Sequence, residues 1–507
     1  MLQRIIFSFM IVLFVFSCKK DIRSDEITFK FIQLNDVYEI APFSGGKYGG
    51  MARVAHVRDS IKKENPNTFM FMAGDFLNPS LLGTLKVDGE RVNGKQMVEV
   101  MNAMDFDLVT FGNHEFDLKE GDLQKRLNES QFQWVSSNIN QVKEDGNGPF
   151  SIQKTDTIPI PTSFILNVDD QNGNSIKIGF VSVTLPSNPV DYVHYADIYD
   201  SAFDAYESIK KDVDLVMGLT HLEIEQDQEL VQKINDISFI MGGHEHHNML
   251  VNEGNSLISK TDANAKSIYI HTFTYNTEAN ELSIESELFP IDDRIASNHD
   301  VEVIVSKWVG ILEMKLKDVV EDPSEVIYVS EIPFDGTDSA SRGIQTNLGE
   351  MITEAMAWSF ENEVDAALVN GGSIRIDDIL PNELSVVDVF RILPFGGGIL
   401  KVDLKGKLLT EVLDYGKEQR GTGAYLQRYN VGVDPDTGVW LIGGELINPD
   451  KTYTVAFSDF LLKGYDIPFL TPENKDVLHI YTPTNEEIAS NICNSIILYL
   501  KSLNNKS

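Results

Sequence analysis

Five short apolar runs alternate with helix-like segments in the first half of the chain. The runs cover residues 28–34, 68–73, 108–111, 213–219 and 237–241. Each has the length of a buried β-strand and is bounded by small or polar residues. Segments between them, such as 52–63 and 96–104, carry apolar residues at helical spacing. The alternation predicts an α/β sheet whose strand ends face one crevice.

Each apolar run is followed by a side chain that can bind a metal ion. In chain order these are Asp36, Asp75, Asn113, His221, and the pair His244 and His246. Carboxylate and imidazole donors of this kind suit Zn, Mn, Fe or Co, and a carboxylate such as Asp75 can bridge two ions roughly 3.5–4 Å apart. A pair of ions lowers the pKa of a bound water and clamps phosphoryl oxygens. Polar residues that only form turns would explain five such strand ends less well than a dinuclear metal centre does.

His114 and Asp117 form a second feature of the third strand end. They are three residues apart, so on a helical turn they share one face. In this scheme His114 is not a ligand. Oriented by Asp117, it is expected to stabilise or protonate the leaving oxygen of a phosphate ester.

Length and charge limit the partners of the protein. The 507 residues predict two or three domains, and the net charge of −35 opposes binding of nucleic-acid polymers or an anionic membrane surface. A small anionic substrate remains compatible if metal ions and a few arginines supply local positive charge.

The N-terminus has the pattern of a secreted protein. Arg4 precedes an apolar run at 5–16, and Phe-Val-Phe-Ser-Cys at 14–18 resembles a bacterial lipoprotein cleavage box. We therefore expect a signal peptide at 1–17, a lipid-modified Cys18, a polar tether at 18–26 and a location in the bacterial cell envelope. The alternative is a plain signal peptide with an incidental cysteine. Cys493 is the only other cysteine, so neither a disulfide framework nor a thiolate metal site is expected.

A long amphipathic segment divides the rest of the chain. Val301, Ile304, Val305 and Trp308 recur at helical spacing within 300–319, and Pro323 follows. We interpret 291–323 as a connector helix between a first domain at 27–290 and a second at 324–505.

The ordered motifs resemble those of a known family. Asp36, Gly74-Asp75, Gly112-Asn113-His114-Glu115, His221 and Gly243-His244-Glu245-His246 resemble the calcineurin-like metallophosphoesterase signature, and 112–117 is most similar to its 5'-nucleotidase branch. The resemblance implies a four-layer β-sandwich with flanking helices and two divalent ions, with Zn, Mn or Co preferred and Fe as a further candidate. It places one ion at Asp36, Asp75 and His246 and the other at Asp75, Asn113, His221 and His244. His114 and Asp117 become the catalytic dyad.

Tyr38 is a departure from that family. The family usually has a histidine there, and a phenol is a weak ligand unless it is deprotonated. Either the first ion loses a ligand, which is our preferred interpretation, or Tyr38 binds a harder ion such as ferric iron.

The second half resembles the C-terminal domain of 5'-nucleotidases, a separate α/β substrate-binding domain. By residue type alone, each arginine of this half could be an ordinary surface residue and each aromatic residue could belong to the core. The resemblance implies that Arg342, Asn370 and Arg375 contact the phosphate or sugar, that Tyr425 and Phe460 stack on the base, and that Asp466 binds the ribose hydroxyls. Tyr425 stands where phenylalanine is common, and Tyr465-Asp466-Ile467 replaces the usual Gly-Asp-Gly.

These features predict metal-dependent hydrolysis of nucleoside 5'-monophosphates to nucleoside and phosphate. The nearest alternatives are a 2',3'-cyclic nucleotide phosphodiesterase and a nucleotide-sugar diphosphatase using the same site. A catalytically inactive, nucleotide-binding surface lipoprotein is an alternative of another class. The substrate and the membrane that holds the lipid anchor are the only partners that the sequence implies.

Overall fold

Two six-stranded sheets face each other in the N-terminal domain. The first has the order β18-β17-β1-β2-β5-β6 and the second β10-β11-β13-β14-β16-β15. Their strands are β1 Glu26–Leu34, β2 Thr68–Met72, β5 Leu108–Val109, β6 Gln133–Trp134, β17 Ser267–Asn276 and β18 Glu281–Pro290, and β10 Ser163–Asp169, β11 Ser175–Val181, β13 Leu215–Leu219, β14 Ile237–Met241, β15 Met249–Glu253 and β16 Ser256–Lys260. In this computed structural model the strand positions confirm an α/β fold, but the run pattern alone suggested one sheet where the structure has two.

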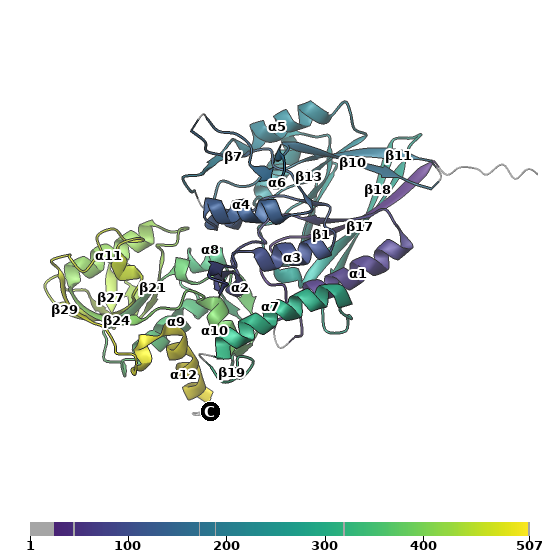
Figure 1. Ribbon diagram of the computed structural model, residues 1–507. Helices are drawn as coiled ribbons and strands as arrows, with labels where there is room; N and C mark the ends of the chain where they lie inside the picture. The colour runs from purple at the N-terminus through teal and green to yellow at the C-terminus, as the bar shows by residue number, and fades with distance from the viewer. Residues whose placement is uncertain are drawn as a thin grey trace, which may run out of the picture.

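Side-chain alternation along β1 explains the layers. Phe29 and Phe31 point into a core shared with Phe180 and Phe239 of the second sheet, while Leu34 and its neighbours on the other face pack under helices. Both faces of this strand are therefore buried, as is usual for parallel strands. The first sheet is covered by α1 Met51–Glu64, α3 Lys95–Ala103 and α4 Glu120–Glu129, and the second by α5 Ile198–Ile209 and α6 Ile224–Lys233. The resulting helix-sheet-sheet-helix stack (Figure 1) confirms the four-layer sandwich.

The C-terminal domain is built on one five-stranded sheet. Its order is β25-β21-β29-β24-β30, formed by Leu426–Tyr429, Ala366–Asn370, Thr452–Ser458, Ile399–Lys405 and Val477–Tyr481. One face packs on α9 Asn347–Trp358, α10 Val386–Ile392 and α12 Ile492–Asn504, and the other on α11 Gly406–Glu418. The domain therefore has its own cores on both sides of its sheet.

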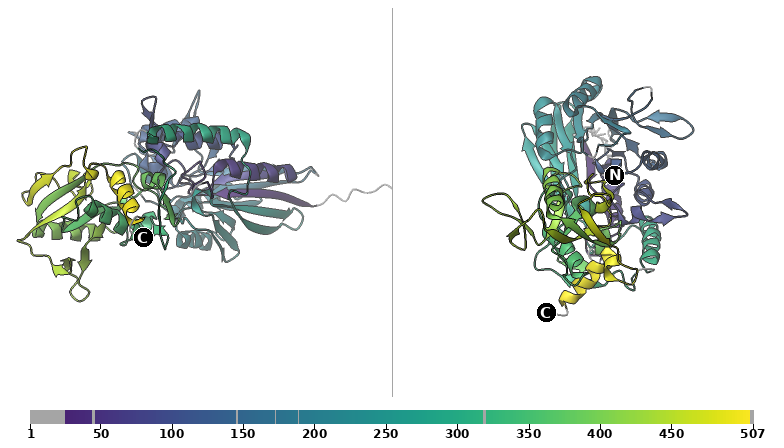
Figure 2. Two further views of the ribbon diagram at one scale, coloured as in Figure 1. Left: turned by 90° about the horizontal axis from the view of Figure 1, so that it is seen from below. Right: turned by 90° about the vertical axis from the view of Figure 1, so that its left-hand side faces the viewer.

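The helix α7, His299–Lys317, runs along the N-terminal domain toward the C-terminal one (Figure 1). It packs on α1 and α3, and Trp308 Nε1 donates to Glu99 at 2.9 Å. The two domains form separate lobes in the left-hand view of Figure 2. The predicted helix at 300–319 thus coincides with the element that leads from one lobe to the other.

The structure describes residues 25–43, 46–144, 146–171, 173–187, 189–317 and 320–504. The predicted signal peptide, Cys18 and most of the predicted tether lie outside these residues. Among the described helices, none has the length and apolar character needed to cross a membrane.

Candidate metal centre and substrate pocket

Unusual backbone conformations mark the ends of the ligand-bearing strands. Asp36, Asp75 and His244 have positive φ values of 54°, 55° and 90°. This region is uncommon for L-residues, although aspartate tolerates it better than most. Strained backbone of this type is concentrated at functional sites.

Two glycines allow strand ends to approach each other, Gly112 within the first sheet and Gly243 between the two sheets. A Cβ atom on Gly112 would lie 2.1 Å from Asp75 Oδ1, and one on Gly243 would lie 2.3 Å from the Ala73 carbonyl oxygen. Any larger residue would push the metal-binding loops apart, so the glycines in the motifs have a steric role.

Glu115 organises the loop that carries Asp75. Its buried carboxylate accepts backbone N–H groups from Asp75 at 2.9 Å, Phe76 at 2.8 Å, Leu77 at 3.0 Å and Gly112 at 2.6 Å. Burial and the nearby Asp75 raise the pKa of Glu115 to about 7, against these hydrogen bonds. Glu115 therefore holds the loop of Asp75 in place through these backbone hydrogen bonds.

His221 brings the two sheets together at one point. Its Nε2 lies 3.2 Å from Asp75 Oδ2, 3.1 Å from Asn113 Oδ1 and 3.9 Å from Asp36 Oδ1. Its Nδ1 contacts the Ala73 carbonyl oxygen at 2.8 Å, which favours a proton on Nδ1 and leaves Nε2 for a ligand. Asp36, Asp75 and His221 offer ligand atoms that all lie within 4.8 Å of one another.

His244 and His246 complete the group. The His244 N–H donates to Asp36 Oδ2 at 2.9 Å and its ring centroid lies 5.5 Å from that of His221. Burial, reinforced by His221, lowers the pKa of His244 to about 3, which favours its neutral imidazole. His246 Nε2 lies 3.4 Å from Asp36 Oδ1.

Asp36 provides the test of whether a cation fits. Its side chain is fully buried, and its Oδ1 makes no hydrogen bond to any described residue although two imidazole nitrogens lie within 4 Å. A buried carboxylate oxygen that accepts no hydrogen bond is a favourable position for a cation. The donor set of carboxylates, amide and imidazoles therefore fits a pair of divalent ions.

His114 and Asp117 stand beside this centre on the 3-10 turn His114–Asp117. His114 Nδ1 lies 2.8 Å from Asp117 Oδ2, and its N–H donates to Asp75 Oδ1 at 2.7 Å. Burial opposes the charged form of His114, but Asp117 and Asp75 outweigh it and raise its pKa to about 10. In this state His114 carries a proton that it can share with a leaving oxygen.

Tyr38 occupies the position of the expected family histidine. Its hydroxyl is within hydrogen-bonding distance of His246 Nε2 at 3.1 Å, Asp377 Oδ2 at 3.2 Å and Asp75 Oδ2 at 3.5 Å. Burial, followed by the charges of Asp377 and Asp75, raises the Tyr38 pKa well above its usual value. A protonated phenol is a hydrogen-bond donor here, in keeping with our preference for the loss of a ligand over a tyrosinate.

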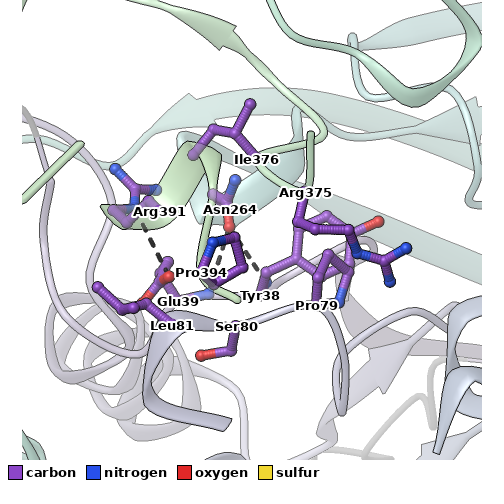
Figure 3. A pocket seen from close by; sticks show the side chains of 10 residues that line it. All are labelled: Tyr38, Glu39, Pro79, Ser80, Leu81, Asn264, Arg375, Ile376, Arg391 and Pro394. Atoms are coloured by element: carbon purple, nitrogen blue, oxygen red, sulfur yellow. Dashed lines mark hydrogen bonds and ion pairs between the residues drawn. The ribbon is translucent and has the colours of Figure 1, made fainter. Parts of the chain in front are cut away.

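The centre opens onto a cleft of about 830 Å³ between the domains. Asp75, Asn113, His114, His244 and His246 line one side, and Asp338, Asp377 and Arg420 of the C-terminal domain line the other. Arg375 from the C-terminal domain binds Asp117 of the dyad. Figure 3 shows a neighbouring interdomain contact, lined by Tyr38, Glu39 and Asn264 from one domain and by Arg375 and Arg391 from the other. Arg391 points at Glu39, and its Nε lies 3.5 Å from Glu39 Oε1.

Two family models match the chain over the domains that contain these groups. Residues 29–248 match the calcineurin-like phosphoesterase model and residues 326–471 the 5'-nucleotidase C-terminal domain model. The chain belongs to the 5'-nucleotidase family of calcineurin-like phosphoesterases. It follows that the protein is a hydrolase of phosphoric esters.

Relatives within this family match over most of the chain. The 5'-nucleotidase of Bos taurus is 25% identical over 477 residues, which are 82% of this chain and 78% of that protein. The trifunctional nucleotide phosphoesterase protein YfkN of Bacillus subtilis (strain 168) is 24% identical over 461 residues, 80% of this chain but 30% of that protein. The structure of a 5'-nucleotidase precursor from Thermus thermophilus shares the fold with a TM-score of 0.69 at 22% identity, covering 94% of this chain and 97% of the other.

A second pocket of about 430 Å³ lies in the 5'-nucleotidase C-terminal domain. Asn370, Phe395 and Phe460 line it. Asn370 Nδ2 donates to Asp466 Oδ2 at 2.6 Å, which places Asp466 beside this pocket. Arg342 is largely buried and pairs with Asp338 at 2.8 Å, at the edge of the interdomain cleft.

Tyr425 is not among the residues that line this pocket. Its ring is buried, and the guanidinium of Arg428 lies 5.8 Å from its centroid. The exposed ring on the pocket with Phe460 is Phe395, which is 62% exposed. Phe395 had no role among the expectations from the sequence, although an aromatic residue in the glycine-rich loop 394–397 was a usable signal.

Asp377 is the other residue that the sequence analysis missed. It follows Arg375 by two positions and comes from the C-terminal domain, yet its carboxylate reaches His114, His246 and Tyr38. Most of the predicted residues of the N-terminal domain lie at one centre: Asp36, Asp75, Asn113, His114, Asp117, His221, His244 and His246. Arg375 contacts this centre, and Arg342 lies at the edge of the cleft. The second pocket brings together Asn370, Phe460 and Asp466.

Proposed function

We propose that the protein hydrolyses nucleoside 5'-monophosphates to nucleoside and phosphate. One observation carries this proposal. The domain with a ring-lined pocket also places an arginine, Arg375, on the dyad at the metal centre of the other domain. A substrate with a planar base at one end and a phosphate at the other matches this arrangement.

The metal-binding residues divide into two sets that share Asp75. Asp36, Asp75 and His246 would hold one divalent ion, and Asp75, Asn113, His221 and His244 the other. When bound, such a pair supplies a hydroxide near neutral pH and neutralises charge on the phosphoryl oxygens. Zn, Mn or Co suits this donor set best.

The side chains around the ions bind and orient the substrate. Arg375 and Arg342 supply guanidinium groups for the phosphate oxygens. His114, held by Asp117, carries a proton at the position where the leaving 5' oxygen develops charge. Phe460 offers a ring for stacking on the base, with Phe395 as a second ring on the same pocket, and Asp466 accepts hydrogen bonds from ribose hydroxyls.

Substrate binding and release require the domains to separate. The contacts between Arg375 and Asp117 and between Arg391 and Glu39 close the cleft and must break for a nucleotide to enter. We propose that the C-terminal domain rotates or slides relative to the other about the segment that follows α7.

A second substrate class has a specific observation in its favour. The similarity to a protein named a trifunctional nucleotide phosphoesterase supports further nucleotide substrates, and we propose 2',3'-cyclic nucleotides or nucleotide-sugar diphosphates as the candidates. Both present a phosphate to the same centre and a base to the same pocket.

The predicted lipid anchor sets the location in this proposal. With Cys18 acylated, the enzyme is held at the bacterial cell envelope and acts on nucleotides there. Labelling of the wild-type chain with a radioactive fatty acid in a bacterial host, and its loss in Cys18→Ser, is the expected result, whereas equal labelling of both chains would contradict the anchor.

Phosphate release from AMP tests the proposed activity. The enzyme is stripped with a chelator and assayed with added Mn, Co or Zn, beside a panel of cyclic nucleotides and nucleotide sugars. We expect turnover only with added metal and the highest kcat/KM for a nucleoside 5'-monophosphate. The products are also separated, because hydrolysis of a cyclic nucleotide or a nucleotide sugar releases no free phosphate. No hydrolysis of any of these substrates with any metal would reject the function in favour of an inactive binding protein.

A further inference from the structure

Asp377 brings a carboxylate of the C-terminal domain into the metal centre of the N-terminal domain. We propose that Asp377 is a ligand of the metal ion held by Asp36 and His246, in place of the histidine that Tyr38 replaces. The proposal depends on the proposed function only in that it assumes an ion at this position.

The side chain of Asp377 points at the first set of ligands. Its Oδ2 lies 3.3 Å from His246 Nε2 and 3.2 Å from the Tyr38 hydroxyl. His246 Nε2 in turn lies 3.4 Å from Asp36 Oδ1, the buried oxygen without a hydrogen bond to any described residue. The carboxylates of Asp377 and Asp36 therefore approach the same imidazole nitrogen, His246 Nε2. This nitrogen is the atom that would bind the ion.

Its second carboxylate oxygen is held away from the centre. The Asp338 N–H donates to Asp377 Oδ1 at 2.7 Å. This bond fixes the rotation of the carboxylate and leaves Oδ2 directed at His246 and Tyr38. Asp377 itself is 6% exposed, so a charge there needs a nearby cation.

The backbone of Asp377 prepares His246 for metal binding. The His246 Nδ1 contacts the Asp377 carbonyl oxygen. A proton on Nδ1 makes that bond and leaves the lone pair of Nε2 directed toward the ion, as in many metal sites where a carbonyl orients a histidine ligand. Asp377 also has a positive φ of 44°, the conformation that Asp36 and Asp75 share.

The neighbouring Asp378 provides a matched control. It docks the same loop on the N-terminal domain through Lys266 and through Asn264 Nδ2 at 3.3 Å. It lies on the wall of the same cleft, but its hydrogen bonds and ion pairs go to residues outside the proposed ligand set. Asp378→Asn therefore removes the charge that pairs with Lys266 and leaves the carboxylate of Asp377 in place.

Metal binding in the absence of substrate tests the proposal. Chelator-stripped wild type, Asp377→Asn and Asp378→Asn are titrated with Mn²⁺ by calorimetry, with the EPR signal of a coupled manganese pair as a second readout. We expect Asp377→Asn to lose about tenfold or more in affinity for one of two ions and to lose the coupled signal at limiting metal. Asp378→Asn should bind both ions within about twofold of wild type.

Restoring the family residue gives a rescue test. The double variant Tyr38→His with Asp377→Asn should regain the second ion, because the histidine supplies the ligand that the asparagine has lost. Thermal unfolding of each variant without metal establishes that all are folded alike before the titrations are compared.

Two outcomes would overturn the proposal. They are an unchanged affinity for both ions in Asp377→Asn, and an equal loss in Asp377→Asn and Asp378→Asn. Unchanged affinity together with faster AMP turnover in Asp377→Asn would mean that the carboxylate blocks the phosphate position. Because the titrations contain no substrate, two bound ions without AMP hydrolysis would reject the proposed function and leave the role of Asp377 standing.

Discussion

Arg375 and His114 contact the same oxygen of Asp117, the Oδ2 atom, although Arg375 belongs to the other domain. Burial opposes the charge on Asp117, but Arg375 and His114 together hold the pKa of its carboxyl far below its usual range. One carboxylate thus orients the proposed proton donor and receives the proposed phosphate-binding arginine. The proposed catalytic dyad and the second domain are therefore in direct contact.

Replacing His114 by Ala should lower kcat for AMP by about 10²- to 10⁴-fold with little change in KM, because a general acid acts mainly in the transition state. The loss should be smaller for an aryl phosphate, whose phenolate leaves without needing a proton. Steady-state kinetics with both substrates measure this difference. Metal content should be unchanged, since His114 is not a ligand in this scheme. Equal losses on both substrates would remove the proton-donor role.

Replacing Phe460 by Ala should raise KM for AMP about tenfold, because one stacking contact contributes about 1–3 kcal/mol. Phe395→Ala should have an effect of the same kind, since both rings line one pocket. Hydrolysis of an aryl phosphate without a base should hardly change in either variant.

The buried Tyr425 serves as the contrast to these two rings. Tyr425→Ala should lower the unfolding temperature and alter KM for AMP and for the aryl phosphate in the same proportion. A loss confined to nucleotides in Tyr425→Ala, with Phe395→Ala unaffected, would restore the stacking role that the sequence suggested for Tyr425.

Lys260 neutralises two buried carboxylates behind the metal loop. Its Nζ lies 3.0 Å from Asp227 Oδ2 and also binds Glu245, which stands between His244 and His246. Lys260→Met leaves these carboxylates without their cation and should lower the free energy of unfolding by about 3–5 kcal/mol. Urea unfolding measures the loss. The variant Lys260→Met with Asp227→Asn and Glu245→Gln should recover much of it, and a triple variant no more stable than the single one would contradict this explanation.

Asp107 should make stability depend on pH between about 4 and 6. Burial raises its pKa from 3.8 to about 6, against the hydrogen bond that Met70 N–H donates to it. The folded state therefore holds the proton more tightly than the unfolded one. The contribution of Asp107 to the free energy of unfolding is fully present below pH 3.8. It declines by about 2–3 kcal/mol as the pH rises through 6. Urea unfolding of Asp107→Asn should lack this decline, and parallel curves for both proteins would refute it.

The elements that position the site follow closely from the sequence. The run at 237–241 coincides with β14, because both of its ends are fixed by a change from apolar to small or polar residues. The run at 108–111 is longer than β5, which ends at Val109. The Thr110 N–H still donates to the Met72 carbonyl oxygen at 3.1 Å, and the chain then turns toward Asn113. Local pattern could not show that β1 and β14 belong to different sheets, because both read as strands buried on each face.

The contacts between domains could not be predicted in this way. Tyr38 and Asp377 are 339 residues apart, and nothing in either local pattern indicates that they meet. The same limit applies to Phe395 and Tyr425. The sequence identifies both as aromatic, but only the packing of the C-terminal domain decides which ring faces the pocket and which is buried.

Anomalous diffraction from crystals grown with Mn²⁺ is the most direct measurement of the dinuclear centre. We predict two peaks roughly 3.5–4 Å apart that share Asp75, one reached by Asp36 and His246 and the other by Asn113, His221 and His244. Peaks elsewhere on the protein, or none within ligand distance of Asp75, would contradict the centre and with it the proposed hydrolysis of nucleotides.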